Sequence, residues 1–199
     1  MNARPSFRAQ VLQAREDAIV DTVNRLLADK GFDAMTVDLV AAEVGIAKAS
    51  LYKHFASKEA ILAEMLVSIS EELLEIGSMR VAEAEGPTEA LAALVDWHID
   101  FALEHRALIV VQDRDWESLP DDARETVRTL QRSYVELWSR QLRLLDRSRS
   151  RDQARAMAHA AFGLINSTPH SGVLPDSRMR PLLRAMALGA LGLGAQDLP

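Results

Sequence analysis

The strongest constraint on the fold is a short segment in which two helical patterns meet at a glycine. Thr36 is a favourable helix N-cap, Val40 lies on the inward face of the helix that follows, and Gly45 ends that helix. A second helical pattern begins at once, with Leu51 and Phe55 one turn apart as its apolar anchors. Two short helices joined by a tight turn, with glycine where the chain needs a positive φ, predict a helix-turn-helix.

Helical periodicity continues through almost the whole chain, which predicts an all-α fold. A first helix ends at Gly31, Ser57 caps a long fourth helix that reaches about Met79, and Gly86-Pro87 breaks the pattern. The later helices are expected over residues 89–104, 105–116, 122–145 and 150–167, with a last one starting at Asp176 or Ser177. The sequence has no strand-like alternation and no internal repeat.

Capping signals refine three of these later helices. Asp122 and Glu125 have the spacing of a capping box, as do Ser150 and Gln153. Pro181 falls in the first turn of the last helix, where its missing N–H costs little.

Composition and charge narrow the class of protein. The chain has no cysteine, no secretory signal at its start, and no apolar stretch as long as the roughly 20 residues that a membrane span needs, so we expect a cytoplasmic protein without a membrane partner. The net charge of −6 argues against a protein that coats nucleic acid over its whole surface. Between residues 45 and 58, however, the chain carries three lysines and His54 and no acid, which predicts a local basic surface.

The same segment resembles a known family. Gly45 to Phe55, followed by Ser57-Lys58-Glu59, resembles the signature of TetR-type (TetR/AcrR) transcriptional regulators, and Thr36-Val37 and Val40-Ala41 fit it too. The resemblance covers roughly the first third of the chain. It implies a three-helix helix-turn-helix DNA-binding domain over residues 1–57. A larger all-helical domain, for ligand binding and dimerisation, follows over residues 58–199, in a fold of about nine helices.

Carried over position by position, the resemblance implies two kinds of DNA contact. The residues implied to hold phosphates are Thr36, Tyr52, His54 and Lys58; those implied to face base edges are Lys48, Ala49 and Lys53, with Ser50 also on the DNA side. Ala47 stands where the family often has a capping serine, which costs about 1 kcal/mol. Ala49 stands where glycine is common, and its methyl group can contact a thymine methyl.

The resemblance further implies a homodimeric regulator, most simply a repressor, that leaves a palindromic DNA operator when a small, largely apolar effector binds. Lipid-like and acyl-coenzyme A-like molecules are among the effectors it allows. No cofactor, metal or catalytic residue is expected, because the sequence has no paired-carboxylate motif, His-Glu-x-x-His, glycine-rich phosphate loop or nucleophile elbow. The alternative is a helical ligand carrier or adaptor protein that keeps the first domain only as a folding unit.

Most of the large aromatic side chains follow residue 90, where the effector pocket is expected. Aromatic side chains with a few polar groups are typical of small-molecule pockets, although each of them is also an ordinary core residue. The polar residues beside Pro169 are either pocket groups or helix caps. The candidate effector-binding residues are Trp97, Phe101, Trp116, Tyr134, Trp138, Phe162, Asn166 and His170.

The last two helices carry the candidate dimer interface. The final helix has no polar side chain between Arg184 and Gln196, and a helix that is apolar all round must be covered on both sides. The candidate interface residues are Met157, Ala161, Ile165, Leu183, Met186, Ala187, Ala190 and Leu191.

Six arginines crowd the turn between the helices expected over residues 122–145 and 150–167, against only Asp146 and Asp152. They are Arg140, Arg143, Arg147, Arg149, Arg151 and Arg155. Such a run is either a solvated loop or an anion-binding site for a phosphate-bearing ligand.

Overall fold

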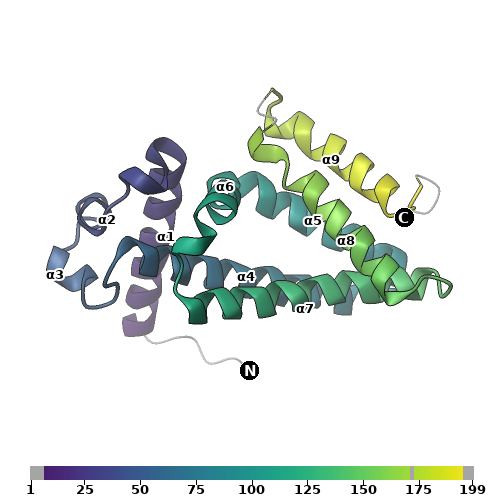
Figure 1. The fold of residues 1–199 in the computed structure, drawn as a ribbon, viewed down its shortest axis with the longest axis horizontal. Helices are drawn as coiled ribbons and strands as arrows, with labels where there is room; N and C mark the ends of the chain where they lie inside the picture. Colours follow the sequence, from purple (N-terminus) through teal and green to yellow (C-terminus); the bar gives the residue numbers. More distant parts are fainter. Residues whose placement is uncertain (1–6, 171–172, 195–199) are drawn as a thin grey trace.

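The structure, a computed structural model, describes residues 7–170 and 173–194, and helices make up most of both ranges (Figure 1). In chain order they are α1 (Phe7–Ala34), α2 (Val37–Val44), α3 (Lys48–Leu51), α4 (Lys58–Glu83), α5 (Pro87–Glu104), α6 (Arg106–Asp115), α7 (Asp121–Leu145), α8 (Arg151–Ile165) and α9 (Asp176–Ala190). Two single 3-10 turns, η1 (Trp116–Ser118) and η2 (Thr168–His170), follow α6 and α8. The described residues contain no strand, and the expected all-α fold is confirmed. None of the described helices has the length and apolar character of a membrane span.

The ends of the first helices are set by the local signals that the sequence carries. The Leu39 N–H donates to Thr36 Oγ1 at 3.1 Å, and the Ala60 N–H donates to Ser57 Oγ at 3.2 Å. Gly45 ends α2 with φ 74°. Because this φ lies in the left-handed region, a residue with a Cβ would be strained at the turn into α3.

The N-terminal part, which we call the head, comprises α1 to α3 and residues 58–69 of α4. Its core is built on almost fully buried side chains, among them Leu26, Met35 and Leu51. Leu108 of α6 and Val127 of α7 join the same core, and α1 packs against α6. The head is therefore seated directly on the rest of the chain, without a flexible linker.

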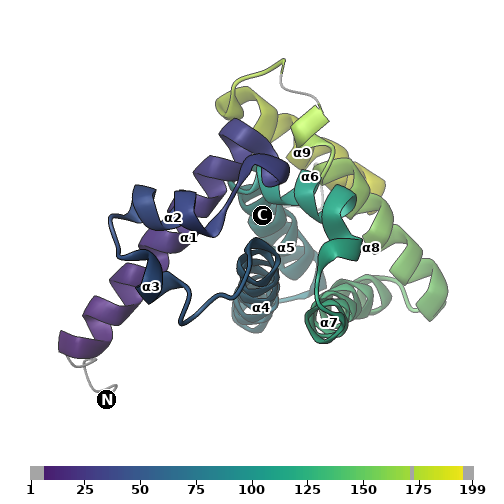
Figure 2. The ribbon, with the colours of Figure 1, turned by 60° about the vertical axis from the view of Figure 1, so that its left-hand side comes forward.

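The remainder, which we call the body, comprises the second half of α4 and α5 to α9. α4 and α7 run side by side along the long axis, and α8 and α9 lie together on an outer side (Figures 1 and 2). Three ion pairs tie α9 to α5 and α6. They are Arg184–Asp96 at 2.8 Å, Arg106–Asp176 at 2.5 Å and Arg180–Asp100.

Four further predictions about helix ends and breaks are tested by the structure, and one of them is confirmed. Ser150 and Gln153 form the predicted reciprocal capping box of α8. The predicted capping box at Asp122 is wrong, because the N-cap of α7 is Pro120, two residues earlier. α3 ends at Leu51 and continues as a turn towards Phe55, and Pro181 lies in the second turn of α9 rather than the first.

Candidate functional site

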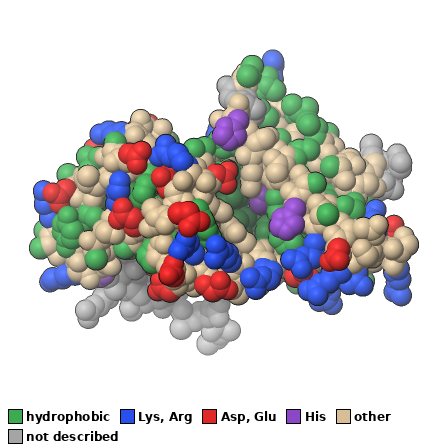
Figure 3. All heavy atoms as spheres, viewed as in Figure 1, with side chains coloured by type: hydrophobic (Ala, Val, Ile, Leu, Met, Phe, Trp, Pro, Cys, Tyr) green, Lys and Arg blue, Asp and Glu red, His purple; other side chains and the backbone are tan. Residues whose placement is uncertain are grey.

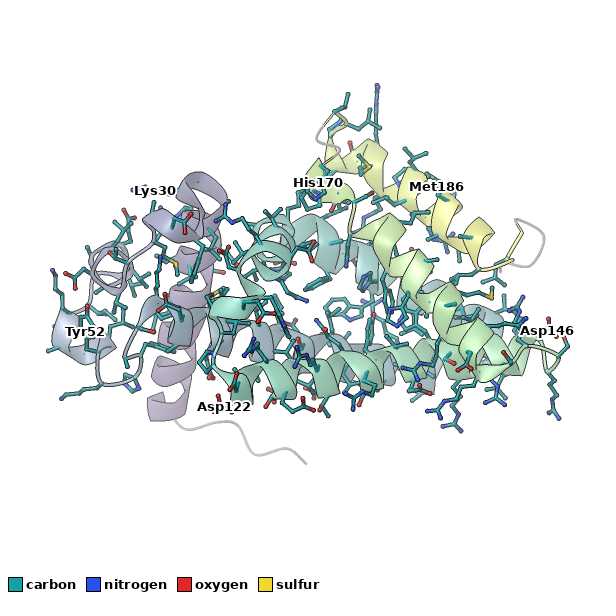
Figure 4. All side chains as sticks on the ribbon, in the orientation of Figure 1. Lys30, Tyr52, Asp122, Asp146, His170 and Met186 are labelled. Atoms are coloured by element: carbon teal, nitrogen blue, oxygen red, sulfur yellow. The ribbon has the colours of Figure 1, made fainter. Side chains whose placement is uncertain are left out.

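α3 and the turn after it present a row of exposed side chains at one end of the molecule (Figures 1 and 4). Leu51 is fully buried and fixes α3 on the core of the head, whereas Tyr52 is 50% exposed. The other predicted DNA-facing residues of this segment are exposed, or partly exposed in the case of Ser50: Lys48, Ala49, Ser50, Lys53 and His54. We call this row the α3 surface.

Two predicted DNA contacts of the head already have a partner within the chain. Lys48 Nζ lies 2.5 Å from Asp38 Oδ2, and Thr36 Oγ1 accepts the capping bond from Leu39. Both side chains of the Lys48–Asp38 pair are largely exposed, and such a pair contributes about 1 kcal/mol at most. Lys48 can therefore exchange Asp38 for another anion at little cost.

Lys58 has a structural role that the sequence analysis missed. Its ammonium donates to the carbonyl oxygens of Phe32 at 3.1 Å and Asp33 at 3.3 Å, and it lies 4.5 Å from the centre of the Phe32 ring. These contacts tie the start of α4 to the end of α1. The predicted phosphate contact competes with them, so we assign Lys58 to the stability of the head.

The body contains a cluster of packed rings around His98 of α5, which we call the His98 cluster. The His98 ring centre lies 4.7 Å from that of Phe162, 5.7 Å from Tyr134 and 6.0 Å from Trp138. Phe101 lies 5.8 Å away on the same helix. Three helices, α5, α7 and α8, thus bring four of the predicted effector-binding residues together.

Several polar atoms in this cluster are buried and make no well-formed hydrogen bond to a described residue, although His98 lies near Asn166 and Tyr134 near Trp138. They are both ring nitrogens of His98, the Tyr134 hydroxyl, Trp138 Nε1 and Asn166 Oδ1. Each such group costs about 1–3 kcal/mol relative to a paired one. A site with this many incomplete donors and acceptors fits a molecule or waters that complete them.

Burial also sets the charge state of the cluster. Burial lowers the pKa of His98 to about 4, and the neighbouring Asn166 side chain acts in the opposite direction. Burial raises the pKa of Tyr134. Both side chains are therefore neutral near pH 7, so the cluster offers hydrogen bonds and aromatic surface but no charge.

Three predicted effector-binding residues lie outside the cluster. Trp97 donates its Nε1–H to the Leu73 carbonyl of α4 at 3.2 Å, and Trp116 packs against the core of the head. His170 is exposed in η2 (Figure 4). His98 was not among the candidate effector-binding residues. The signal that could have placed it there is that His98 and Phe101 share one face of α5.

The structure shifts the candidate dimer surface from the predicted faces of α8 and α9 to the outer faces of the same two helices. Five of the predicted interface residues are buried in the chain's own core and cannot form an outer surface: Ala161, Ile165, Leu183, Ala187 and Leu191. Met186 and Ala190 are exposed and Met157 is half-buried. The apolar stripes that the sequence shows are therefore mainly the inward faces of α8 and α9.

Comparison with known proteins places both parts of the chain in one family. Residues 19–65 match the model of bacterial regulatory proteins of the tetR family, and residues 84–170 match a tetracyclin repressor-like C-terminal domain. The two matches together cover more than half of the chain. The chain belongs to the TetR family.

Individual relatives agree with this assignment. The TetR-family chain is 32% identical over 109 residues to the HTH-type transcriptional repressor KstR2 of Mycolicibacterium smegmatis, over 54% of the chain and 53% of KstR2. It therefore spans about half the length of that relative. The structure resembles PfmR from Thermus thermophilus, with a TM-score of 0.73, 24% identity, and coverage of 88% of this chain and 97% of PfmR. It also resembles FadR from Bacillus subtilis in complex with stearoyl-CoA, with a TM-score of 0.70, 18% identity, and coverage of 89% and 96%.

Proposed function

We propose that this TetR-family chain is a homodimeric repressor that binds a palindromic DNA operator and leaves it when a small, largely apolar effector binds in the body. The observation that carries the proposal is the α3 surface, which is exposed and basic in a chain of net charge −6. The TetR family consists of transcriptional regulators rather than enzymes.

The α3 surface has the chemistry of major-groove recognition. Lysine side chains read guanine edges, and small methyl groups contact thymine, so we assign Lys48, Ala49 and Lys53 to base edges. Tyr52 and His54 are exposed beside them and are assigned to phosphates. We place the division between the DNA-binding domain, residues 1–57, and the effector-binding domain, residues 58–199, at the start of α4.

The DNA-binding proposal is tested by selecting bound fragments from sheared genomic DNA of the source organism and measuring their affinity. Lys53→Ala should weaken operator binding by about 1–3 kcal/mol, roughly 5- to 150-fold, with the loss concentrated at one position of each half-site. Lys30→Ala, which removes an exposed lysine at the far end of α1, is the matched control (Figure 4). Equal affinity of Lys53→Ala and the parent protein for operator and for random DNA would contradict the assignment of α3.

The outer faces of α8 and α9 are the proposed dimer interface. On α8 the exposed residues include Ala156, Ala160 and Gly163, and on α9 Leu182 and Met186 are 45% and 49% exposed. Small residues on one helix and apolar side chains on the other allow two copies to pack closely across a two-fold axis. Such a dimer presents two heads to half-sites about 34 Å apart, or a multiple of that distance.

The His98 cluster is the proposed effector site. Its neutral donors and acceptors fit an apolar molecule with a hydroxyl, carbonyl or amide group, because burying a charged group costs far more than burying a hydrogen-bonded neutral one. FadR, with a similar fold, is solved with stearoyl-CoA, which supports a lipid-like effector. In Figure 3 the face of the body is hollowed near its middle, with hydrophobic and histidine side chains at the edge.

The effector proposal is tested by the fluorescence of Trp138. The chain has three tryptophans, so Trp97→Phe/Trp116→Phe leaves Trp138 as the only reporter. We expect its emission to change with a neutral alicyclic or long-chain alcohol or ketone, or with stearoyl-CoA. Tyr134→Phe should weaken that binding about tenfold without lowering the free energy of unfolding, since it removes an unpaired buried hydroxyl. Unchanged binding in Tyr134→Phe would contradict the site.

α4 offers the route from the effector site to the DNA. It begins at the head, and Gly77 in its second half packs so closely on α7 that an added Cβ would lie 2.8 Å from Tyr134 Cε2. An effector that displaces Tyr134 therefore presses on α4. The release of DNA requires only that the effector bind more tightly to one placement of the heads than to the other.

A further inference from the structure

A basic groove lies at the end of α7 that is remote from the head. It is a cavity of about 740 Å³ whose lining includes Arg140, Arg143, Leu144, Arg147 and Arg151, with Glu136 as its only acid. Lys and Arg side chains gather there in Figure 3, and Figure 4 labels Asp146 at this end and Tyr52 at the opposite end. The groove is therefore separate from the α3 surface.

Most of the positive charge in this groove is not balanced by ion pairs among the described residues. Glu136 is shared by Arg151 at 3.1 Å and Arg155 at 3.3 Å. Arg140, Arg143 and Arg147 form no ion pair with any described residue. Arg140 and Arg143 lie about one turn apart on α7, and Arg147 lies in the turn that follows this helix. All three line the same groove, so their like charges repel one another. An anion that binds several of them at once relieves that repulsion.

An apolar hollow adjoins the groove. It has a volume of about 310 Å³ and lies between the end of α4, the start of α5 and α7, with Val81, Pro87 and Leu137 in its lining. Arg140 and Leu144 line both spaces. Leu144 is 49% exposed, so an apolar surface leads from the arginines to the hollow.

We propose that this groove binds a small amphiphile that carries at least two neighbouring phosphate groups. The phosphates contact Arg140, Arg143 and Arg147, whose guanidinium groups bind phosphate oxygens in a bidentate manner. The apolar part crosses Leu144 and enters the adjoining hollow. None of the residues that line the two spaces belongs to the His98 cluster, so this site does not depend on the proposed effector site.

Isothermal titration calorimetry with three probes tests the site: farnesyl diphosphate, inorganic pyrophosphate as the head group alone, and farnesol as the tail alone. We expect farnesyl diphosphate to bind most tightly and pyrophosphate to bind more weakly, with both weakened by added salt. Arg143→Gln should reduce the affinity for both about tenfold, and Arg143→Gln/Arg147→Gln about a hundredfold. Leu144→Asn should reduce the affinity for farnesyl diphosphate only.

The matched control is Arg132→Gln, an exposed arginine on α7 outside the groove, which should bind both probes as the parent protein does. The proposal is overturned if neither phosphate probe binds, if Arg132→Gln loses as much affinity as Arg143→Gln, or if farnesol binds as tightly as farnesyl diphosphate. Loss of DNA affinity in probe-free Arg143→Gln/Arg147→Gln would instead assign the groove to DNA, and a change in oligomeric state would assign it to a subunit contact. The Lys53→Ala measurement is independent of these results, so failure here and failure of the repressor proposal are distinguishable.

Discussion

The α3 surface and the His98 cluster differ in how their polar groups are satisfied. On the head, the side chains are exposed to water or paired at short range, as in the Lys48–Asp38 pair and the Thr36 cap. In the body, His98, Tyr134 and Trp138 are buried with polar atoms that lack a partner among the described residues. The exposed side chains of the head can therefore contact a partner without rearrangement. The buried polar atoms of the cluster can form hydrogen bonds only with a ligand or water molecule that enters it.

Stability and function conflict in the His98 cluster more than on the head. Breaking an exposed pair such as Lys48–Asp38 when DNA binds costs the head little free energy, because such pairs are weak. The cluster keeps several unpaired polar groups, each of which costs about 1–3 kcal/mol. The contrast between the head and the His98 cluster can be tested by substitutions in each of them.

The first prediction tests whether α8 forms the dimer interface and whether operator binding requires that dimer. Gly163→Arg adds a charge to the proposed interface, and nothing lies within 4 Å of the added Cβ, so the monomer should fold. We expect a monomer in light scattering and a loss of operator affinity of more than about a hundredfold. Gly163→Ala is the control and should remain dimeric. A dimeric Gly163→Arg protein would place the interface elsewhere.

The second prediction concerns the pH dependence of stability, which the buried His98 of the body should dominate. Burial lowers the pKa of His98 from 6.5 to about 4. Between these two pH values, His98 is therefore protonated in the unfolded chain but neutral in the folded chain. The free energy of unfolding should therefore fall as the pH drops from 6.5 to 4, by up to about 3 kcal/mol.

His98→Phe should remove most of this pH dependence in urea unfolding experiments. Part of it remains, because burial lowers the pKa of His105 as well. Tyr134→Phe alters the same cluster without removing a histidine and should keep the pH dependence of the parent protein. An identical pH dependence in His98→Phe and the parent would show that water reaches His98 in the folded state.

The third prediction contrasts two lysines of the head. Lys58→Met keeps the length of the side chain but leaves the Phe32 and Asp33 carbonyls without their donor, so the free energy of unfolding should fall by about 1–2 kcal/mol. Lys53→Met should change it by less than about 0.5 kcal/mol while weakening DNA binding. Thermal melts with operator titrations measure both. If Lys58→Met is as stable as the parent protein, the structural role is wrong and Lys58 is reassigned to the predicted phosphate contact.

The smallest effect concerns the Lys48–Asp38 pair. Asp38→Asn frees Lys48 and removes a negative charge from the DNA side of the head, so operator affinity should rise about threefold. Asp29→Asn, an exposed acid on α1, is the control. Weaker binding in Asp38→Asn would mean that Asp38 holds Lys48 in its DNA-binding position.

Parts of this protein were open to prediction because neighbouring residues decide them. The turn at Gly45, the caps at Thr36 and Ser57 and the exposed row on α3 follow from contacts within a few residues. The Ser150–Gln153 box was predictable for the same reason. The box at Asp122 failed because Pro120 already begins α7, and a capping pattern does not reveal which residue the helix starts from.

Tertiary structure alone decided the other sites, because they join residues far apart in the chain. The sequence shows apolar stripes on α8 and α9 but not which side of each helix faces the chain's own core. Five residues predicted for the dimer interface are for this reason buried inside the chain instead. It contains the aromatic residues but does not show that His98, Tyr134 and Phe162 meet while Trp97 and Trp116 do not. It places six arginines near one turn, yet only the packing of α4, α5 and α7 shows that an apolar hollow adjoins them. Helix periodicity fixes which residues share a face, and only the packing of the helices fixes what that face meets.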